Sequence, residues 1–223
     1  MKKGLNIFFL LVFTCAAFFA SEYRFTINEK GQIYQNKVEI KKTEQGYYLK
    51  SFVTKEDQKD SVTEAKLNKD YETVEWRFKS QKGDIDVVAV RQENKLIITG
   101  KFGGKENNKK EIGIDNRPWH QIFQLGMMKF AISEKAPDYV EFWGIRPDNP
   151  ESVGVLAARR EKIETVEVNG KKVETSHLHI GLAGWLSIFW TGDYWFRKSD
   201  GLYIKAAPSG GVTAELIEEL PDK

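Results

Sequence analysis

Cysteine, histidine and methionine are scarce in this sequence of 223 residues, which holds one cysteine, three histidines and three methionines. The single cysteine, Cys15, lies in an apolar N-terminal stretch. If that stretch is cleaved off, no thiol is left to form a disulfide, attack a substrate or ligate a metal. The sequence therefore gives no support to a thiol enzyme, a disulfide-bonded domain or a cysteine metal site.

Recognisable catalytic motifs are also missing. No H-E-x-x-H, G-x-S-x-G or P-loop pattern occurs, and the glycine pair Gly103–Gly104 precedes no obvious helix. Most acidic residues fall at alternating polar positions, which is typical of the solvated face of a strand. We therefore predict that the protein is not an enzyme and uses no cofactor. An unrecognised hydrolase is the third of three functional alternatives.

The sequence has no real excess of charge of one sign. It carries 34 basic and 32 acidic residues, and Lys2 and Lys3 account for the difference. Proteins that hold nucleic acid or anionic lipid by charge show an excess of lysine and arginine. The balance predicts no nucleic-acid partner and favours apolar burial as the basis of binding. The oligomeric state stays open.

The N-terminus has the features of a secretory signal peptide. Lys2 and Lys3 precede an uncharged apolar run from Leu5 to Ala20, and polar sequence begins at Ser21. This run is shorter than the roughly 20 residues that span a bilayer. We predict cleavage after residue 20 and export to the periplasm, which leaves residues 21–223 as a single β-rich domain. We do not expect lipidation at Cys15, although contact with a membrane stays open.

Hydrophobic residues alternate with polar ones along most of the remaining chain, which predicts strands. The clearest hairpin signal is Asn169–Gly170 between two alternating runs, because both turn residues must accept positive φ. A second hairpin is predicted at Glu93–Asn94, while the polar stretch 103–108 reads as a loop. About ten short strands predict a mainly β fold, a curved antiparallel sheet or an incomplete β-barrel.

One segment departs from this alternation and has helical spacing. Pro118 stands at a plausible first helical position, with Asp115 or Asn116 before it as a cap. We predict one helix from Pro118 to about Phe130 that covers a face of the sheet. Its apolar face carries Trp119, Ile122, Phe123, Met127 and Phe130.

The C-terminal third is the most distinctive part of the chain. It contains Val166–Thr175 around the Asn-Gly turn, the apolar run Gly184–Trp190, and Asp193–Tyr203 with the sequence DYWFRKSDGLY. From Glu164 to Lys205 this pattern resembles exported bacterial proteins of unknown function related to the periplasmic lipoprotein-carrier and lipoprotein-receptor fold. The resemblance implies a half-barrel closed by helices around an apolar cavity, which in the carriers holds acyl chains. This chain departs from the carriers because its sequence predicts one helix rather than several.

The leading hypothesis is an exported, non-enzymatic protein that binds a lipid, an acyl group or another amphipathic ligand in the concave face of the sheet. The alternative is a structural or interaction module of the cell envelope whose aromatic residues form a solid core. Arg159 and Arg197 are candidates to pair with an anionic head group. The aromatic candidates for the ligand site are Trp119, Phe123, Phe130, Trp143, Trp185, Trp190 and Trp195.

Two closely spaced histidines raise the question of a metal site. His177 and His179 stand two residues apart on a predicted strand, so their side chains share one face, and His120 or Glu174 could supply a third ligand. The H-x-H spacing alone is weak, and two histidines on the wetter face of a strand are the better explanation. We therefore predict no metal site.

Overall fold

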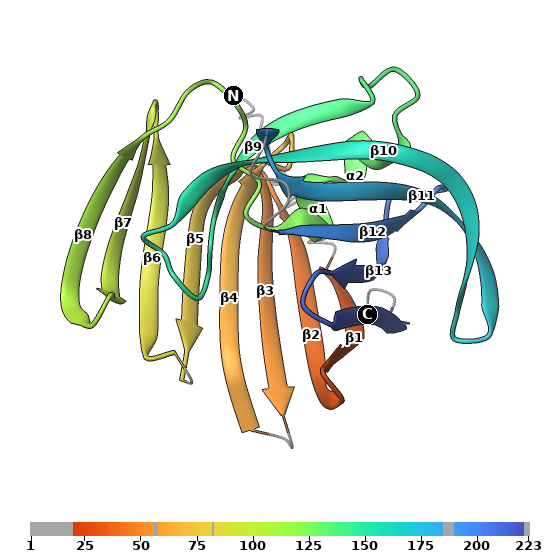
Figure 1. Ribbon diagram of the computed structural model, residues 1–223, viewed down its shortest axis with the longest axis horizontal. Coiled ribbons are helices and arrows are strands. Elements are labelled where there is room, and N and C mark those ends of the chain that lie inside the picture. The colour runs from red at the N-terminus through yellow and green to blue at the C-terminus, as the bar shows by residue number, and fades with distance from the viewer. Residues whose placement is uncertain (1–19, 56–57, 82, 185–189, 221–223) are drawn as a thin grey trace, which may run out of the picture.

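The computed structural model describes residues 20–55, 58–81, 83–184 and 190–220. Fourteen antiparallel strands form one continuous sheet in the order β8-β7-β6-β5-β4-β3-β2-β1-β14-β13-β12-β11-β10-β9. The sheet curls, so that β10–β12 run across the direction of β2–β6 in the view of Figure 1. It does not close into a barrel, because its two outermost strands, β8 and β9, do not pair with each other.

The first eight strands form an up-and-down meander. They are β1 (Ala20–Glu29), β2 (Gln32–Thr43), β3 (Gly46–Lys55), β4 (Gln58–Asn68), β5 (Thr73–Ser80), β6 (Ile85–Gln92), β7 (Lys95–Phe102) and β8 (Lys105–Gly113). Two short helices follow, α1 (Phe123–Gly126) and α2 (Met128–Ile132). The remaining strands are β9 (Tyr139–Ile145), β10 (Val153–Val168), β11 (Lys171–Leu182), β12 (Thr191–Arg197), β13 (Tyr203–Pro208) and β14 (Val212–Leu220).

The predicted fold class is confirmed, and the two predicted hairpins form as expected. Glu93, Asn169 and Gly170 have positive φ values of 49°, 51° and 69°, which the tight turns require. Asn169 also donates from Nδ2 to the carbonyl oxygens of Leu216 and Ile217, at 2.9 and 3.0 Å. The tip of the long β10–β11 hairpin is thereby fastened to β14.

The number of strands exceeds the prediction of about ten because several strands are polar. Residues 105–108, predicted as part of a loop, belong to β8, and the turn before it is confined to Gly103 and Gly104. β8 lies at the edge of the sheet and its residues alternate between exposed and half-buried. A strand with so little burial needs few apolar residues, so hydrophobic alternation does not reveal it.

The helical segment begins later than predicted and is split. Residues 118–121 are not helical, because their backbone forms hydrogen bonds with β9 instead. The amide of Trp143 donates to the carbonyl of Pro118 at 2.8 Å, and the amide of His120 donates to the carbonyl of Trp143 at 3.1 Å. The helical hydrogen bonds therefore start only at the carbonyl of Ile122. A membrane-spanning helix does not occur among the described residues.

A single hydrophobic cluster fills the space that the curled sheet encloses, and it draws on both halves of the chain. The side chains of its largest members are less than 2% exposed. They come from strands of both halves and from the segment between β8 and β9. These residues are Trp76, Phe102, Trp119, Met127, Phe142 and Phe196.

Candidate functional site

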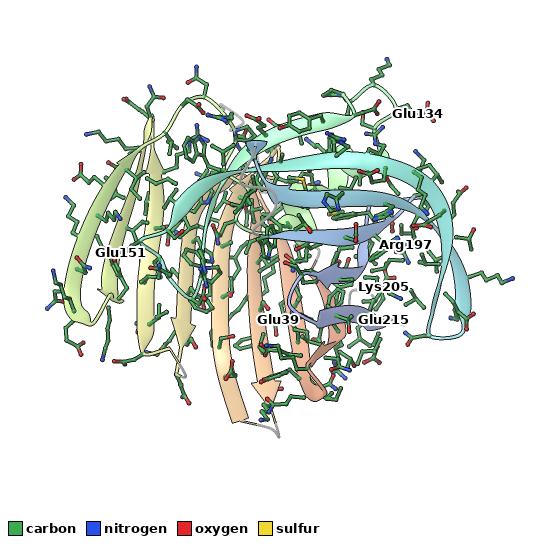
Figure 2. The ribbon with its side chains drawn as sticks, viewed as in Figure 1. Glu39, Glu134, Glu151, Arg197, Lys205 and Glu215 are labelled. Atoms are coloured by element: carbon green, nitrogen blue, oxygen red, sulfur yellow. The ribbon has the colours of Figure 1, made fainter. Side chains whose placement is uncertain are left out.

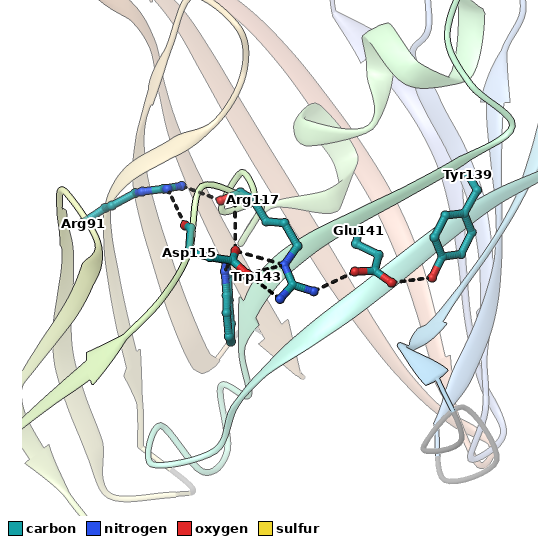
Figure 3. Close-up of polar contacts among 6 residues, drawn as sticks. All are labelled: Arg91, Asp115, Arg117, Tyr139, Glu141 and Trp143. Atoms are coloured by element: carbon teal, nitrogen blue, oxygen red, sulfur yellow. Dashed lines mark hydrogen bonds and ion pairs between the residues drawn. The ribbon is translucent and has the colours of Figure 1, made fainter.

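The segment between β8 and β9 forms polar contacts with two other parts of the sheet, through Arg91 of β6 and Glu141 of β9 (Figure 3). Arg91 of β6 donates to the carbonyl oxygens of Arg117 and Asp115, at 2.9 and 3.1 Å. The Arg117 guanidinium contacts both carboxylate oxygens of Asp115, and its Nη1 lies 2.6 Å from Oε2 of Glu141 on β9. Trp143 Nε1 donates to Asp115 Oδ1 at 2.9 Å. We call this set of residues the edge clasp.

The Arg117 contacts hold the pKa of Asp115 well below its usual value of 3.8. The guanidinium also lies over the Trp143 ring, 5.2 Å from its centroid. Trp143 was predicted as a ligand-binding residue. In the structure Trp143 is half-buried, and its indole belongs to the edge clasp, where it contacts Arg117 and Asp115.

An aromatic patch lies beside α1 on the concave face, and we define it by Phe123, Trp190, Phe142 and Tyr194. The Phe123 ring meets Phe142 and Tyr194 edge-on, at centroid distances of 5.5 and 5.9 Å. It faces Trp190 at 6.4 Å. Phe142 and Tyr194 are buried, whereas Phe123 and Trp190 are half-buried. The patch therefore has an aromatic floor and two partly accessible rings.

Two other predicted aromatic residues on the concave side serve the core and α2. Trp119 is completely buried, and its Nε1 donates to Oε1 of Gln121 at 3.1 Å. Phe130 is half-buried beneath the guanidinium of Arg160, 5.3 Å away. Arg160 Nη2 donates to the carbonyl oxygens of Phe130 and Ser133, which fastens the end of α2 to β10.

The other predicted ligand residues lie on the opposite face of the sheet. Along β12, Tyr194 and Phe196 point inward and are buried, so Trp195 and Arg197 point outward. Arg197, which is labelled in Figure 2, forms ion pairs with Asp200 and Glu219, at 2.5 and 3.0 Å. Arg159 is exposed on β10. Trp185 lies outside the described residues. The candidates are thus divided between two faces rather than gathered at one site.

The convex face carries a histidine cluster, formed by His177, His179, Asp193, Glu164 and Trp195. One carboxylate oxygen of Asp193 lies 2.9 Å from His177 Nε2 and 3.0 Å from His179 Nδ1. The His177 ring stacks on Trp195 at 4.8 Å, and Trp195 Nε1 donates to Glu164 at 2.9 Å. His177 Nδ1 also lies 3.2 Å from Glu164 Oε1.

The two carboxylates of this cluster are stabilised in their charged form. Burial alone would raise the pKa of Asp193, but the hydrogen bonds from His179 and His177 outweigh it and lower the pKa. Lys162 and Trp195 lower the pKa of Glu164. No group of three or more metal-ligating side chains in the described part of the chain is arranged to hold a metal ion. The pair of histidines binds a carboxylate instead.

Two surface pockets in the described part of the chain are lined mainly by polar side chains. One, of about 410 Å³, is open to solvent beside the histidine cluster and is lined by Glu161, Lys162, His177, His179 and Asp193. The other, of about 140 Å³, lies over β3–β5 between Tyr48, Glu64, Ala65, Lys66, Glu75 and Arg77. Neither is the apolar cavity that the resemblance to lipoprotein carriers implies.

Comparison with known proteins bears on the fold alone. The chain is similar to the crystal structure of a β-barrel-like protein of the domain of unknown function DUF1849 from Brucella abortus, with a TM-score of 0.58 and 11% identity. The likeness covers 91% of this chain and 97% of that one. The fold is barrel-like. The hypothetical lipoprotein YmcC from Escherichia coli aligns over 91% of this chain and 85% of its own, at 10% identity and a TM-score of 0.34, which is too low to support an argument. No family model and no curated protein matches the sequence.

Sequence reasoning missed the edge clasp and the partners of the two histidines. Asp115 was considered only as a helix cap. Asp193 and Glu164 lie on other strands, 16 and 13 residues from His177 in the sequence, and they do not stand out among the many acidic residues. One usable signal existed for Asp193. It lies on the same face of its strand as Trp195, and the hairpin topology pairs that strand with β11, placing Asp193 directly opposite His179.

Proposed function

We propose that the protein is an exported, non-enzymatic binding domain whose ligand is hydrophobic or amphipathic, such as a lipid or an acyl group. The observation that supports this most directly is the aromatic patch. Its half-buried Phe123 packs edge-on against the buried rings of Phe142 and Tyr194, and half-buried Trp190 lies beside it. Aromatic rings with one accessible face are suited to cover an acyl chain, because each buried methylene contributes about 0.8 kcal/mol.

The ligand in this proposal lies against the patch and not inside a closed cavity. The core cluster to which the patch belongs includes Trp119, Phe142 and Met127, each at most 1% exposed. No catalytic step is part of the proposal. The two histidines that contact acidic side chains, His177 and His179, are bonded to Asp193 rather than to a hydroxyl or thiol nucleophile.

A titration with undecanoic acid that carries a dansyl group tests this proposal. Replacing Phe123 by alanine removes the central ring of the patch, so we expect the affinity to fall about tenfold, or about 1.4 kcal/mol. The matched control is Ile33→Ala on β2, because Ile33 is 50% exposed and three strands separate β2 from β12, which carries Tyr194 of the patch. Its affinity should equal that of the unchanged protein.

Circular dichroism establishes that each variant is folded before the comparison is made. The proposal is overturned if the unchanged protein does not bind the labelled acid. It is also overturned if Phe123→Ala binds as tightly as Ile33→Ala, since binding would then be unrelated to the patch.

The second candidate is a structural or interaction module of the cell envelope. The solid aromatic core favours it, because Trp76, Trp119 and Phe142 leave none of their rings available to a ligand. Native mass spectrometry of the protein purified from its own envelope separates the two candidates. A bound acyl compound supports the first, whereas protein of unmodified mass together with a failed titration supports the second.

A further inference from the structure

The two outermost strands of the sheet differ in what covers them. β9 is partly covered, because the backbone of Trp143 pairs with Pro118 and His120. β8 pairs with β7 on one side, and no described strand pairs with its other side. It is nine residues long, contains no proline and carries the sequence KENNKKEIG. An exposed edge of this kind is a template for another strand.

Proteins protect such edges with lysine, and β8 contains Lys105, Lys109 and Lys110. A strand that carried lysine alone would repel every copy of itself. β8 also contains Glu106 and Glu111, so both signs of charge occur along the edge. The order of these charges therefore decides which neighbouring strand the edge accepts.

A second copy of the chain that pairs antiparallel with β8 must obey two-fold symmetry, so the pairing is centred on one residue. If the centre is Asn108, Lys105 lies opposite Glu111 and Glu106 lies opposite Lys110. Asn107 then lies opposite Lys109, and Asn108 meets its own copy. Each charged pair occurs twice, and each joins opposite signs.

The neighbouring registers that pair five or more residues bring like charges together. A centre at 107 places Lys105 opposite Lys109. Centres at 109, 110 and 111 place Lys109, Lys110 and Glu111 opposite their own copies. Opposite charges directly across a sheet stabilise it and like charges destabilise it, so the charge order selects one register.

We propose that β8 is a self-association edge, through which two copies of the protein pair antiparallel about Asn108 and continue the sheet from one molecule to the other. The partner is a second copy, because the charges of β8 complement β8 itself in this single register. Within one molecule, Glu111 contacts Lys109 at 2.7 Å and Glu106 contacts Lys101 at 2.6 Å. In the dimer, the carboxylates of these two glutamates also contact the partner's lysines.

Sedimentation velocity over a range of protein and salt concentrations tests the proposal. We expect a reversible dimer whose dissociation constant rises with salt, because exposed ion pairs are screened. Glu111→Lys and Lys105→Glu each create like charges at the Lys105–Glu111 pair, so each should weaken dimerisation about tenfold or more. Lys171→Glu, in the exposed turn region of the β10–β11 hairpin, is the control and should dimerise normally.

The decisive measurement is a mixture of Glu111→Lys with Lys105→Glu. Every introduced charge then faces an opposite charge on the other variant, so the mixture should dimerise as a heterodimer that native mass spectrometry identifies by its mass. A protein that stays monomeric at all concentrations overturns the proposal. So does a dimer that Glu111→Lys leaves unchanged, or a mixture that fails to regain dimerisation.

Discussion

His120 shows how a single side chain can look functional in a sequence and be structural in the fold. It was considered as a third metal ligand beside His177 and His179. In the structure it is 7% exposed, its Nδ1 lies 3.2 Å from the carbonyl oxygen of Tyr71, and its ring packs edge-on against Phe142. Burial lowers the pKa of His120 from 6.5 to about 4. The side chain is therefore a neutral part of the core at neutral pH.

This burial predicts a loss of stability at mildly acidic pH. His120 takes up its proton near pH 4 when folded and near pH 6.5 when unfolded, so its contribution is present above 6.5 and is lost as the pH falls towards 4. At pH 5 the loss amounts to about 2 kcal/mol in the free energy of unfolding. Urea denaturation at several pH values measures it. His120→Gln should flatten the dependence between pH 7 and 5, and a dependence that this substitution leaves unchanged would contradict the prediction.

Gly126 lies against the His120 side chain, so a larger residue at position 126 should clash with it. A Cβ atom at this position would stand 2.7 Å from His120 Nδ1 and 2.9 Å from its Cβ, and both atoms belong to a side chain packed in the core. Gly126→Ala should therefore cost about 1–3 kcal/mol in the free energy of unfolding. Gly113→Ala is the control, because nothing lies within 4 Å of its added atom. Equal stability of the two variants would contradict the packing described for His120.

At the level of elements, hydrophobic patterning predicts strands well where one face is buried. β6 and β7 were predicted as two runs joined at the Glu93–Asn94 turn, and Ile85, Val87 and Ala89 on one face of β6 are buried in the fold. β8 was read in part as a loop because it is an exposed edge. The helix was predicted too early because the spacing of Trp119 and Ile122 is helical, and no local pattern reveals that β9 takes up the preceding backbone.

The edge clasp makes a prediction about how the ends of the sheet are held. Arg117→Ala removes the contacts with Asp115 and Glu141 and the ring contact with Trp143, so we expect a loss of about 1–2 kcal/mol in stability. Arg146→Ala is the control, since Arg146 also binds an aspartate, Asp148, but is 63% exposed and should cost less than about 0.5 kcal/mol. Urea denaturation compares the two. A larger loss in the control would show that the clasp contributes nothing beyond a surface ion pair.

For the whole molecule, the architecture of the continuous sheet could be predicted from the sequence more fully than any one site. The mainly β class and the antiparallel arrangement follow from alternation and turn residues, of which Asn169–Gly170 is the clearest, and a curved sheet or incomplete barrel was expected from the number of strands. The candidate site was less predictable. Side chains from strands far apart in sequence meet only through the curl of the sheet, and the faces of β12 divide Tyr194 from Trp195. Periodicity separates these two faces, but it does not tell which of them binds a ligand.

The shared core also predicts that both halves of the sheet unfold together. Trp76 of β5 and Phe196 of β12 belong to one buried cluster, so neither half can lose its structure without exposing the core of the other. Amide hydrogen exchange should therefore give the slowest protons of β5 and β12 the same opening free energy, equal to that of global unfolding. Amides of the edge strand β8 should exchange through smaller openings, which provides an internal reference. A difference of more than about 1 kcal/mol between β5 and β12 would mean that the halves are separate folding units.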